Sequence, residues 1–439
     1  MGFLTFKGGI HPKDGKDLSK NQAITELLPR GDLLYPLSQH IGAPANPIVK
    51  KGDHVLRGQK IAEAGGFVSA PVYSSVSGNV KGLEVHLGPT GNKVDCIVVE
   101  NDGQYEETEY APVKSLEELT KEEILNMISE AGIVGMGGAG FPTRVKLSPK
   151  EPEKIDYVIA NCAECEPYIT ADYRRMLENT EELVSGMRVV LSLFDNAKGI
   201  FGIEDNKKEC IEKLQEAVKD EPRMEVKVLQ TKYPQGAERQ LIYALTKRAI
   251  HSAMLPADAG CVVDNVETLI GIHYAVMEGR PLTERVVTVS GDDIQSPGNF
   301  KVLLGTNHQE LVDAAGGFKT GPKKVVSGGP MMGFAMVTLN TPVTKTSSSI
   351  LAFSEDEVSK RKSTQCINCG RCVEICPCRL VPSRLAKYAD RHDEETFVAQ
   401  YGMECVECGC CSYVCPAKLP LKQSIGSMRK IAIANKKKK

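Results

Sequence analysis

The chain reads Cys366-Ile-Asn-Cys369-Gly-Arg-Cys372-Val-Glu-Ile-Cys376-Pro377 near its end, and the pattern returns as Cys405-Val-Glu-Cys408-Gly-Cys-Cys411-Ser-Tyr-Val-Cys415-Pro416. Both stretches follow the spacing C-x2-C-x2-C-x3-C-P, which is typical of bacterial ferredoxins that bind 4Fe–4S clusters. In such proteins the fourth cysteine of each run ligates the other cluster. The spacing therefore predicts two clusters, one bound by Cys366, Cys369, Cys372 and Cys415, the other by Cys405, Cys408, Cys411 and Cys376.

Disulfides and zinc are the two competing uses of so many cysteines. Disulfides are typical of secreted chains, and the N-terminus lacks the long apolar core of a signal peptide. Zinc sites also use four cysteines, but rarely with this spacing. Cys378 and Cys410 lie outside the pattern, so we expect them not to be ligands. The 28 residues between Cys376 and Cys405 read as helical, which favours a helical two-cluster ferredoxin domain over the minimal β-type.

Length, charge and composition limit the class of protein. The 439 residues suffice for several domains, and the 15 cysteines indicate a reducing compartment. A formal net charge of −2 suggests no nucleic-acid partner. Residues 360–439 nevertheless carry 16 Lys or Arg against 7 Asp or Glu, so this end could face an acidic redox partner or anionic lipid, or be a solvated tail. The sequence has no run of about 18 apolar residues, so a membrane role would require partner subunits.

The first quarter of the chain predicts an arm followed by a β-rich domain. Residues 1–36 are rich in Gly, Lys and Asp and predict an extended arm. Residues 37–112 predict short strands with frequent turns. Two stretches that begin at Val49 and Ala70 resemble the barrel-sandwich hybrid of biotinyl and lipoyl carriers. Carriers have a lysine at an exposed turn, and none stands between Val68 and Val80, so we expect a structural domain.

Residues 113–284 predict an α/β domain that begins with a helix over 115–135. The helix is followed by Gly135-Met-Gly-Gly-Ala-Gly-Phe-Pro-Thr143. Glycines allow the backbone to approach a phosphate or a ring closely, although such a loop can also be a plain turn. Because the loop follows a helix rather than a strand, the sequence disfavours an ordinary dinucleotide-binding fold.

Polar motifs follow the predicted strands and helices of this domain. A strand over 155–160 ends at Asn161-Cys-Ala-Glu-Cys-Glu-Pro167, and residues 180–250 alternate helix and strand, which predicts a parallel sheet. The carboxyl ends of parallel strands are where such sheets bind ligands. Cys162 and Cys165 form a single pair, which we interpret as free thiols rather than a metal site. Asn265 precedes the helix 269–277, either as a simple cap or at the site of an anion.

Four motifs together resemble the flavin subunit of respiratory complex I. They begin at Gly135, Asn161, Tyr233 and Asn265 and occur in the family's order. The resemblance implies FMN as cofactor, NAD(H) as substrate and Glu164 as a catalytic residue. Ala163 and Ala237 depart from the family's acidic positions, which affects the expected nicotinamide contacts more than FMN binding. The implied cofactor-binding residues are Gly135, Gly137, Gly138, Gly140, Lys146, Asn161, Glu164, Tyr233, Glu238, Asn265 and Thr268.

The remaining segments complete the expected organisation. Residues 285–340 resemble the soluble-ligand-binding (SLBB) β-grasp module of the same complex I protein. Residues 341–359, rich in Thr and Ser, predict a linker. Residues 360–430 predict the two-cluster ferredoxin domain, and residues 431–439 a basic tail. The expected fold class is therefore multidomain α/β, with barrel-sandwich hybrid, flavin, β-grasp and ferredoxin domains in that order.

This order resembles the C subunit of the Rnf family of electron-transport complexes over nearly the whole chain. The resemblance implies an NAD(H)-facing component of a membrane ferredoxin:NAD oxidoreductase that moves Na+ or H+. It also implies a peripheral position on the cytoplasmic side, other membrane subunits as partners, and ferredoxin as an indirect partner. A soluble NADH-dependent cobalamin reductase of the same architecture is the alternative. A non-enzymatic protein with a vestigial flavin pocket is the third hypothesis.

Overall fold

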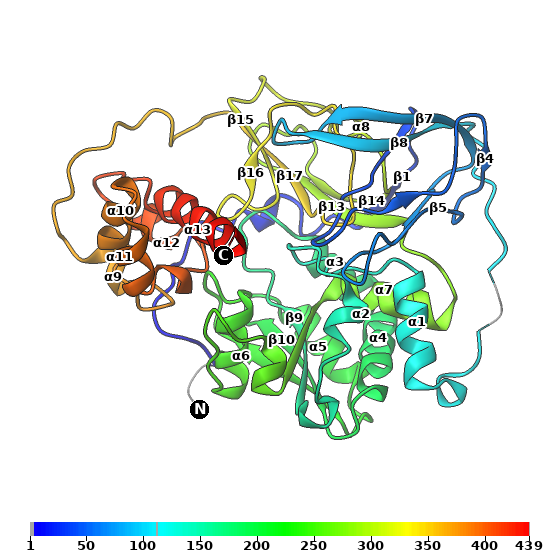
Figure 1. The fold of residues 1–439 in the computed structure, drawn as a ribbon, viewed down its shortest axis with the longest axis horizontal. Coiled ribbons are helices and arrows are strands. Elements are labelled where there is room, and N and C mark those ends of the chain that lie inside the picture. The colour runs from blue at the N-terminus through cyan, green and yellow to red at the C-terminus, as the bar shows by residue number, and fades with distance from the viewer. Residues whose placement is uncertain (1–3, 111–112, 439) are drawn as a thin grey trace.

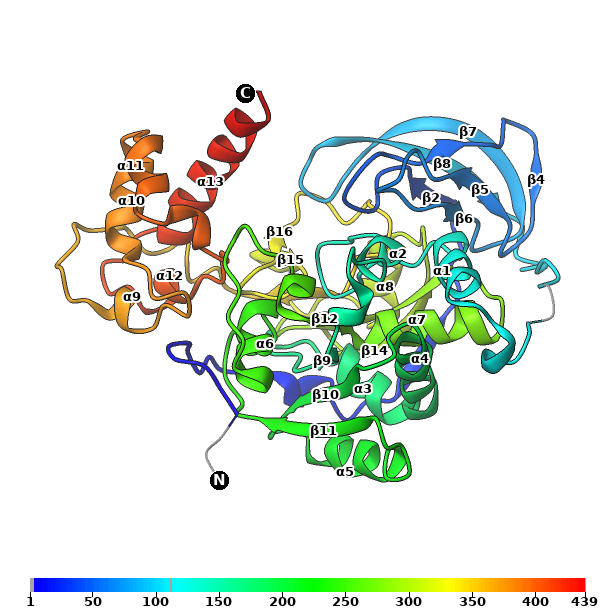
Figure 2. The same ribbon diagram turned by 60° about the horizontal axis from the view of Figure 1, so that its bottom comes forward.

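The computed structural model describes residues 4–110 and 113–438, which form four regions (Figure 1, Figure 2). The α/β region (residues 113–283) and the β-grasp region (residues 284–353) lie together. The barrel region (residues 33–110) lies at one end and the cluster region (residues 360–438) at the other. Among the described residues, no helix combines the length and apolarity needed to cross a membrane.

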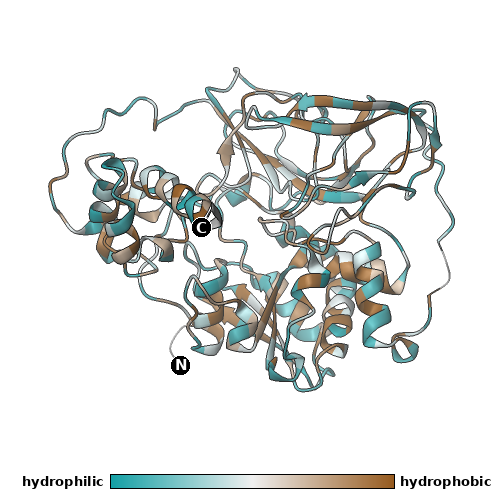
Figure 3. Cartoon of the chain, viewed as in Figure 1, coloured by the Kyte–Doolittle hydropathy of each residue, from teal (hydrophilic) through white to brown (hydrophobic). Residues whose placement is uncertain are grey.

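The α/β region is built on a four-stranded parallel sheet in the order β11-β10-β9-β12. The strands are β9 (Tyr157–Cys162), β10 (Lys198–Glu204), β11 (Met224–Leu229) and β12 (Cys261–Asn265). Helices between successive strands allow them to run parallel, which confirms the predicted βαβ pattern. The central strands β9 and β10 are mostly apolar and buried, since they are covered by helices (Figure 3). These are α1 (Lys121–Glu130), α2 (Thr143–Lys146), α3 (Ala171–Glu178), α4 (Thr180–Ser192), α5 (Lys208–Ala217), α6 (Glu238–Thr246) and α7 (Val266–Met277), with short 3₁₀ turns at Leu116–Glu118, Pro152–Lys154 and Pro256–Ala259.

The first helix of this region begins later than the sequence predicts. Thr120 caps α1, because its hydroxyl accepts the N–H of Glu123 at 3.2 Å while the Glu123 carboxylate accepts the N–H of Thr120 at 2.8 Å. Ser115 and Glu118 form a second capping box around a single 3₁₀ turn. Two consecutive capping boxes therefore divide the predicted helix 115–135, and α1 ends at Glu130, ahead of the glycine loop.

The barrel region consists of two small antiparallel sheets packed around an apolar core. One sheet has the order β2-β8-β7-β4 and the other β3-β5-β6. Leu33, Tyr35, Val55 and Ile61 are completely buried between them. The strands are β2 (Leu33–Pro36), β3 (Asn46–Pro47), β4 (His54–Val55), β5 (Lys60–Glu63), β6 (Val72–Tyr73), β7 (Gly78–Leu87) and β8 (Lys93–Asn101).

The β-grasp region contains a six-stranded sheet in the order β1-β14-β13-β17-β15-β16. The predicted linker 341–359 is wrong, because β17 (Ser349–Phe353) lies inside this sheet, parallel to β13 and antiparallel to β15. Ile350, Leu351 and Ala352 are completely buried there, whereas the Thr- and Ser-rich approach to them resembles a linker. The other elements are β1 (Ile24–Leu27), β13 (Glu284–Ser290), β14 (Gly298–Leu303), β15 (Lys324–Ser327), β16 (Phe334–Ala335) and α8 (His308–Ala314).

The N-terminal segment is extended but is attached along its length. Leu4 forms a bridge with Leu229 of β11, and Ile10 forms one with Tyr233. After a 3₁₀ turn at Lys16–Leu18, strand β1 adds to the β-grasp sheet by pairing in parallel with β14. The segment therefore connects the α/β region to the β-grasp region, and the predicted arm is part of the packed structure.

The cluster region is helical, and its last helix replaces the predicted basic tail. Helix α13 (Leu421–Lys438) continues beyond residue 431 because Ile425, Met428 and Ala432 recur on one face and pack into the region's core. Asn435 also donates a hydrogen bond to Glu394 at 2.6 Å. The other elements are α9 (Arg371–Glu374), α10 (Pro382–Asp390), α11 (Glu394–Ala399), a 3₁₀ turn at Gly402–Glu404 and α12 (Cys410–Val414).

Candidate functional site

The glycine loop between α1 and α2 is closed on itself and fixed to α7. The N–H of Gly135 donates to the carbonyl of Phe141 at 2.8 Å, and the N–H of Met136 donates to the buried hydroxyl of Thr268 at 2.9 Å. Among the described residues, no atom lies within 4 Å of a Cβ added at Gly138 (φ 151°). A Cβ added at Gly137 would lie 3.0 Å from that of Asn265. The loop therefore presents one open face, at Gly138.

Two asparagines from the sequence motifs stand side by side at the carboxyl edge of the sheet. Asn161 is the next-to-last residue of β9 and Asn265 is the last residue of β12, and the two residues are paired in register. The side-chain oxygen of Asn265 accepts the N–H of Glu267 at 3.0 Å and so caps α7. The Asn161 amide donates to the carbonyl of Gly236 at 2.8 Å. Segments far apart in the sequence thus meet at one edge, where the positive end of α7 favours an anion.

Glu164 lies at the same edge, with one carboxylate oxygen engaged and the other free. Oε1 accepts the N–H of Asp172 at 2.7 Å and that of Tyr173 at 3.4 Å, at the start of α3. Oε2 is buried, has no hydrogen-bond partner among the described residues, and lies 3.6 Å from Nζ of Lys16. The backbone of Glu164 adopts φ 44°, a left-handed conformation that is uncommon for residues other than glycine.

Three charged residues at this edge were not predicted from the sequence. Asp172 accepts a hydrogen bond from the Asn265 amide at 2.7 Å, and burial, with a smaller effect of Glu164, raises the pKa of Asp172 to about 7. Lys16 and Lys207 are buried, and Nζ of Lys207 donates to the carbonyl of Ala163 at 2.6 Å. Asp172 could have been found as an acid in the first turn of a helix that follows a strand end. The lysines carry no such signal, because they come from the N-terminal segment and from the turn before α5.

Lys146, predicted as a cofactor-binding residue, is engaged by the protein itself. Its Nζ donates to the carbonyl of Val263 at 2.7 Å and to the carboxylate of Asp264 at 2.9 Å. The same ammonium lies 3.8 Å from a Cβ added at Gly135, so it stands beside the glycine loop. Burial raises the pKa of Glu238, and nearby Lys146 opposes that effect. Lys146, Asp264 and Glu238 thus form a charged group next to the loop.

Tyr233 lies away from the glycine loop, at the boundary with the cluster region. Its side chain is 1% exposed, and its hydroxyl donates to the backbone carbonyl of Cys408 at 2.8 Å. The neighbouring Gln235 is completely buried, and neither polar atom of its side chain has a hydrogen-bond partner among the described residues. The structure therefore joins Tyr233 to a predicted cluster cysteine rather than to the other predicted flavin residues.

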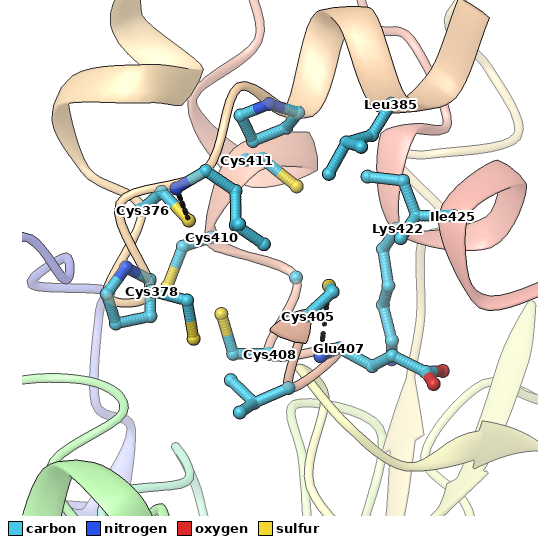
Figure 4. Close-up of a pocket in the computed structure, with 15 residues that line it drawn as sticks. Cys376, Cys378, Leu385, Cys405, Glu407, Cys408, Cys410, Cys411, Lys422 and Ile425 are labelled. Atoms are coloured by element: carbon cyan, nitrogen blue, oxygen red, sulfur yellow. Dashed lines mark hydrogen bonds between the residues drawn. The ribbon is translucent and has the colours of Figure 1, made fainter. Parts of the chain in front are cut away.

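The eight cysteines of the two runs line two separate cavities. One, which we call the second-run cavity, is shown in Figure 4, where the sulfurs of Cys376, Cys405, Cys408 and Cys411 surround a common space. Backbone N–H groups approach two of these sulfurs: Leu380 donates to Cys376 and Glu407 to Cys405, both at 3.4 Å. The other we call the first-run cavity. The second-run cavity is lined by Cys376, Cys405, Cys408 and Cys411, with Cys378 and Cys410 beside them, and the first-run cavity by Cys366, Cys369, Cys372 and Cys415.

The cysteines fall into the two groups that the spacing predicts, each including the fourth cysteine of the opposite run. Within residues 4–110 and 113–438, no three His, Cys, Asp or Glu side chains converge as they would around a single metal ion. The thiol of Cys410 is directed to the carbonyl of Tyr233, at 3.9 Å. Each cavity is thus lined by four cysteines of the two runs.

Several polar contacts join the α/β, β-grasp and cluster regions where they meet. Arg239 of α6 forms an ion pair with Glu404 at 3.0 Å. The carboxylate of Glu166 accepts the N–H groups of Met331 and Met332 at 3.0 and 2.8 Å. Nζ of Lys422 on α13 donates to the carbonyl of Met331 at 2.9 Å. The second-run cavity therefore faces the junction of three regions.

Models of four protein families match the chain in succession. They are described as the RnfC barrel sandwich hybrid domain over residues 4–104, the Nuo51 FMN-binding domain over 128–274, the SLBB domain over 286–335, and the 4Fe-4S dicluster domain over 365–419. These matches confirm the predicted fold class and the two kinds of cofactor, FMN and 4Fe–4S clusters. They correspond to the four regions of the structure.

Curated relatives extend the match over most of the chain. The C subunit of the proton-translocating ferredoxin:NAD+ oxidoreductase complex of Clostridium ljungdahlii is 47% identical over 384 residues, 87% of this chain and 84% of the relative. The C subunit of the Na+-translocating complex of Acetobacterium woodii is 43% identical over 389 residues, 88% of each chain. The chain belongs to the family of Rnf C subunits. Because these two relatives are named for different ions, similarity to them does not assign the ion for this member of the family.

Two further comparisons concern length and fold. The C subunit of the ion-translocating oxidoreductase complex of Vibrio cholerae is 41% identical over 389 residues, which are 88% of this chain but 50% of that relative. A crystal structure of an NAD+-reducing [NiFe]-hydrogenase in the air-oxidized state aligns with a TM-score of 0.50 at 20% identity, covering 76% of this chain and 67% of that chain. The latter likeness concerns the fold alone.

Proposed function

We propose that this Rnf C subunit carries electrons between NAD(H) and the other subunits of an ion-translocating ferredoxin:NAD oxidoreductase complex. FMN, when bound, exchanges a hydride with NAD(H) and single electrons with 4Fe–4S clusters. Membership of the Rnf family and the matched FMN-binding and dicluster domains support this function. A second function finds no specific support among the residues described.

The glycine loop and the edge of the parallel sheet would hold the flavin. Gly138 leaves open space where the backbone can be approached closely, and the start of α7 beside Asn265 favours a phosphate group. Oε2 of Glu164 and Oδ2 of Asp264 are buried acceptors that receive no hydrogen bond from the described residues. This donor and acceptor set fits a ligand with one phosphate group and a ring that carries N–H groups. Gly135, Gly137, Gly140, Lys146, Asn161, Glu238 and Thr268 shape the same edge.

We assign the cluster ligands as two sets of four. Cys366, Cys369, Cys372 and Cys415 would bind one cluster, and Cys376, Cys405, Cys408 and Cys411 the other. Backbone N–H groups are directed at two of these sulfurs, as expected for cluster ligands. Cys378 and Cys410 remain non-ligands in this proposal, since each set is complete without them.

The proposed order of the flavin site and the two cluster sites rests on the contact between Tyr233 and Cys408. This contact attaches the second-run cavity to the α/β region, whereas the first-run cavity lies on the side away from it, with Cys369 exposed. The residues of the second-run cavity thus stand between the flavin edge and the first-run cavity. We propose that the first-run cavity faces partner subunits, with the chain peripheral on the cytoplasmic side of the membrane and ferredoxin an indirect partner.

Gly138→Val tests the flavin site directly. The valine side chain would occupy the open space at the loop, so we expect the FMN content of the purified protein to fall by roughly tenfold or more. Gly103→Val is the matched control, because Gly103 also has positive φ (71°) and open space around an added Cβ, but lies in the barrel region. Full FMN occupancy in Gly138→Val, or equal loss in both variants, would refute the assignment. FMN is measured fluorimetrically after acid extraction.

A further inference from the structure

The N-terminal segment lies directly along the strand-end loop that contains Glu164. The N–H of Tyr168 donates to the carbonyl of Asp14 at 2.6 Å, and Gly15 packs against the Tyr168 ring. The hydroxyls of Ser19 and Thr170 are 2.8 Å apart. Lys16, between these contacts, is therefore held against the loop from both sides.

Lys16 directs its ammonium group into the interior of this loop. The residue is 7% exposed, and Nζ donates to the carbonyls of Glu166, at 3.0 Å, and Ile169. An ammonium has three donors, so one remains for the carboxylate of Glu164, whose Oε2 lies 3.6 Å away. A buried ammonium needs a compensating charge, and Glu164 supplies it.

A second buried lysine at the loop has its donors fully used by other groups. Nζ of Lys207 donates to the carbonyl of Ala163 at 2.6 Å, to Glu204 at 3.2 Å and to Asn206 at 3.1 Å. Its three donors are thus engaged. Lys16 is therefore the ammonium that can act on Glu164 directly, while Lys207 fixes the backbone beside it.

Glu164 needs such support because its conformation is unusual. Its φ of 44° is uncommon for a residue with a side chain and persists where surrounding contacts determine it. On one side the start of α3 binds Oε1 through two N–H groups. On the other side Lys16 faces Oε2, which has no hydrogen-bond partner among the described residues.

We propose that Lys16 is a positioning residue that orients the Glu164 carboxylate toward an N–H group of bound NAD(H). The segment around Lys16 would then complete the nucleotide site. The proposal rests on the proposed function, because it assumes that this edge of the sheet binds NAD(H). A purely structural role of Lys16, as an anchor for the N-terminal segment, is the competing explanation.

A double-mutant cycle of Lys16→Met and Glu164→Gln separates the two explanations. The complete protein, loaded with FMN and clusters, is titrated with NAD+ by calorimetry, and KM and kcat are measured for NADH-dependent ferricyanide reduction. Loss of a charged contact predicts that Lys16→Met raises Kd and KM by roughly tenfold, with a smaller change in kcat. If Lys16 acts through Glu164, adding Lys16→Met to Glu164→Gln weakens NAD+ binding little further.

Two variants serve as controls for folding and for charge. Lys16→Gln keeps N–H donors for the loop carbonyls but removes the charge, so it should bind NAD+ as weakly as Lys16→Met while retaining FMN. Lys20→Met removes an equal charge from the same segment, where Lys20 pairs with exposed Asp17 at 2.6 Å, and should bind NAD+ normally.

Three outcomes would overturn the inference. These are additive effects in the double variant, unchanged NAD+ affinity in Lys16→Met, and normal affinity in Lys16→Gln when Lys16→Met is impaired. Failure of the proposed function looks different, because the unmodified protein would then not bind NAD+ at all.

Discussion

The two cysteine runs have the same spacing but lie in opposite environments. Residues 405–415 are buried or partly buried apart from Tyr413, with Cys408 at 7% exposure, and they face the α/β and β-grasp regions. Residues 366–374 are mostly exposed, and Ile367, within the first run, is 66% exposed. The chain thus uses one ligand pattern to build two sites. The second-run cavity is the inner site, and the first-run cavity is the outer site.

The difference between the runs originates outside the pattern itself. Tyr233 and Arg239, both in the α/β region, contact Cys408 and Glu404, so the neighbouring region covers the second run. The chain before the first run, residues 354–365, forms a long loop at the outer side of the cluster region (Figure 1). Ligand spacing therefore predicts the clusters, whereas contacts between regions decide which cavity faces inward.

Truncations that remove both cysteine runs should have the largest effect, and the outcome depends on where the chain is cut. A chain that ends after Glu355 keeps β17 and should retain FMN while losing all iron. A chain that ends after Thr346 loses β17, whose buried Ile350 and Leu351 occupy the middle of the sheet, and should not fold. FMN content and far-ultraviolet circular dichroism of the two products provide the test. Equal FMN retention in both truncated chains would show that β17 is not needed for the fold of the β-grasp region.

Cys376→Ser should affect the second-run cavity although it lies in the first run. The unmodified protein should bind about eight irons, the content of two cubanes. Cys376→Ser should perturb the cluster of the inner site, and Cys415→Ser that of the outer site. Iron analysis and electron paramagnetic resonance of reduced samples distinguish the two signals. Loss of the outer signal in Cys376→Ser would mean that each run binds its own cluster.

Tyr233→Phe should weaken the boundary between the α/β region and the cluster region without disturbing the first-run cavity. It removes the hydrogen bond to the carbonyl of Cys408, a buried contact of about 1 kcal/mol. Tyr401→Phe is the matched control, because Tyr401 is 71% exposed. Chemical denaturation should show a lower free energy of unfolding for the first variant and no change for the second. An equal loss in the free energy of unfolding in both variants would show that the hydrogen bond of Tyr233 does not stabilise this boundary.

The smallest expected effect concerns the ion pair between Arg239 and Glu404. The pair is partly exposed, so Arg239→Gln should lower the free energy of unfolding by about 0.5 kcal/mol, and less at high salt. Lys360→Gln, which breaks an exposed pair with Glu355, serves as the control and should have no measurable effect. A salt-independent loss in Arg239→Gln would show that the contact contributes by packing rather than by charge.

Most of the features that could be predicted from the sequence come from local patterns. The duplicated cysteine spacing grouped the eight cysteines as the cavities do, because ligand geometry constrains neighbouring residues. The alternation of helix and strand gave the parallel sheet, and the glycine loop and Asn265 motifs met at its edge. Each of these features is encoded within a short stretch of sequence.

The features that were missed depend on contacts between distant segments. Strand β17 was hidden because its five residues follow a Thr- and Ser-rich stretch, and their burial depends on β13 and β15. Helix α13 was mistaken for a tail because terminal lysines mask the apolar face that begins at Ile425. Lys16 approaches Glu164 across 148 positions of sequence, so no local spacing could indicate the contact.

The most direct test of the account compares Cys369→Ser and Cys408→Ser under anaerobic conditions. Each variant should lose one cluster, and NADH is added while the remaining cluster is followed by electron paramagnetic resonance. We predict that NADH still reduces the inner cluster in Cys369→Ser but fails to reduce the outer cluster efficiently in Cys408→Ser. The opposite pattern, with fast reduction of the outer cluster when the inner site is broken, would contradict the proposed order of the two sites.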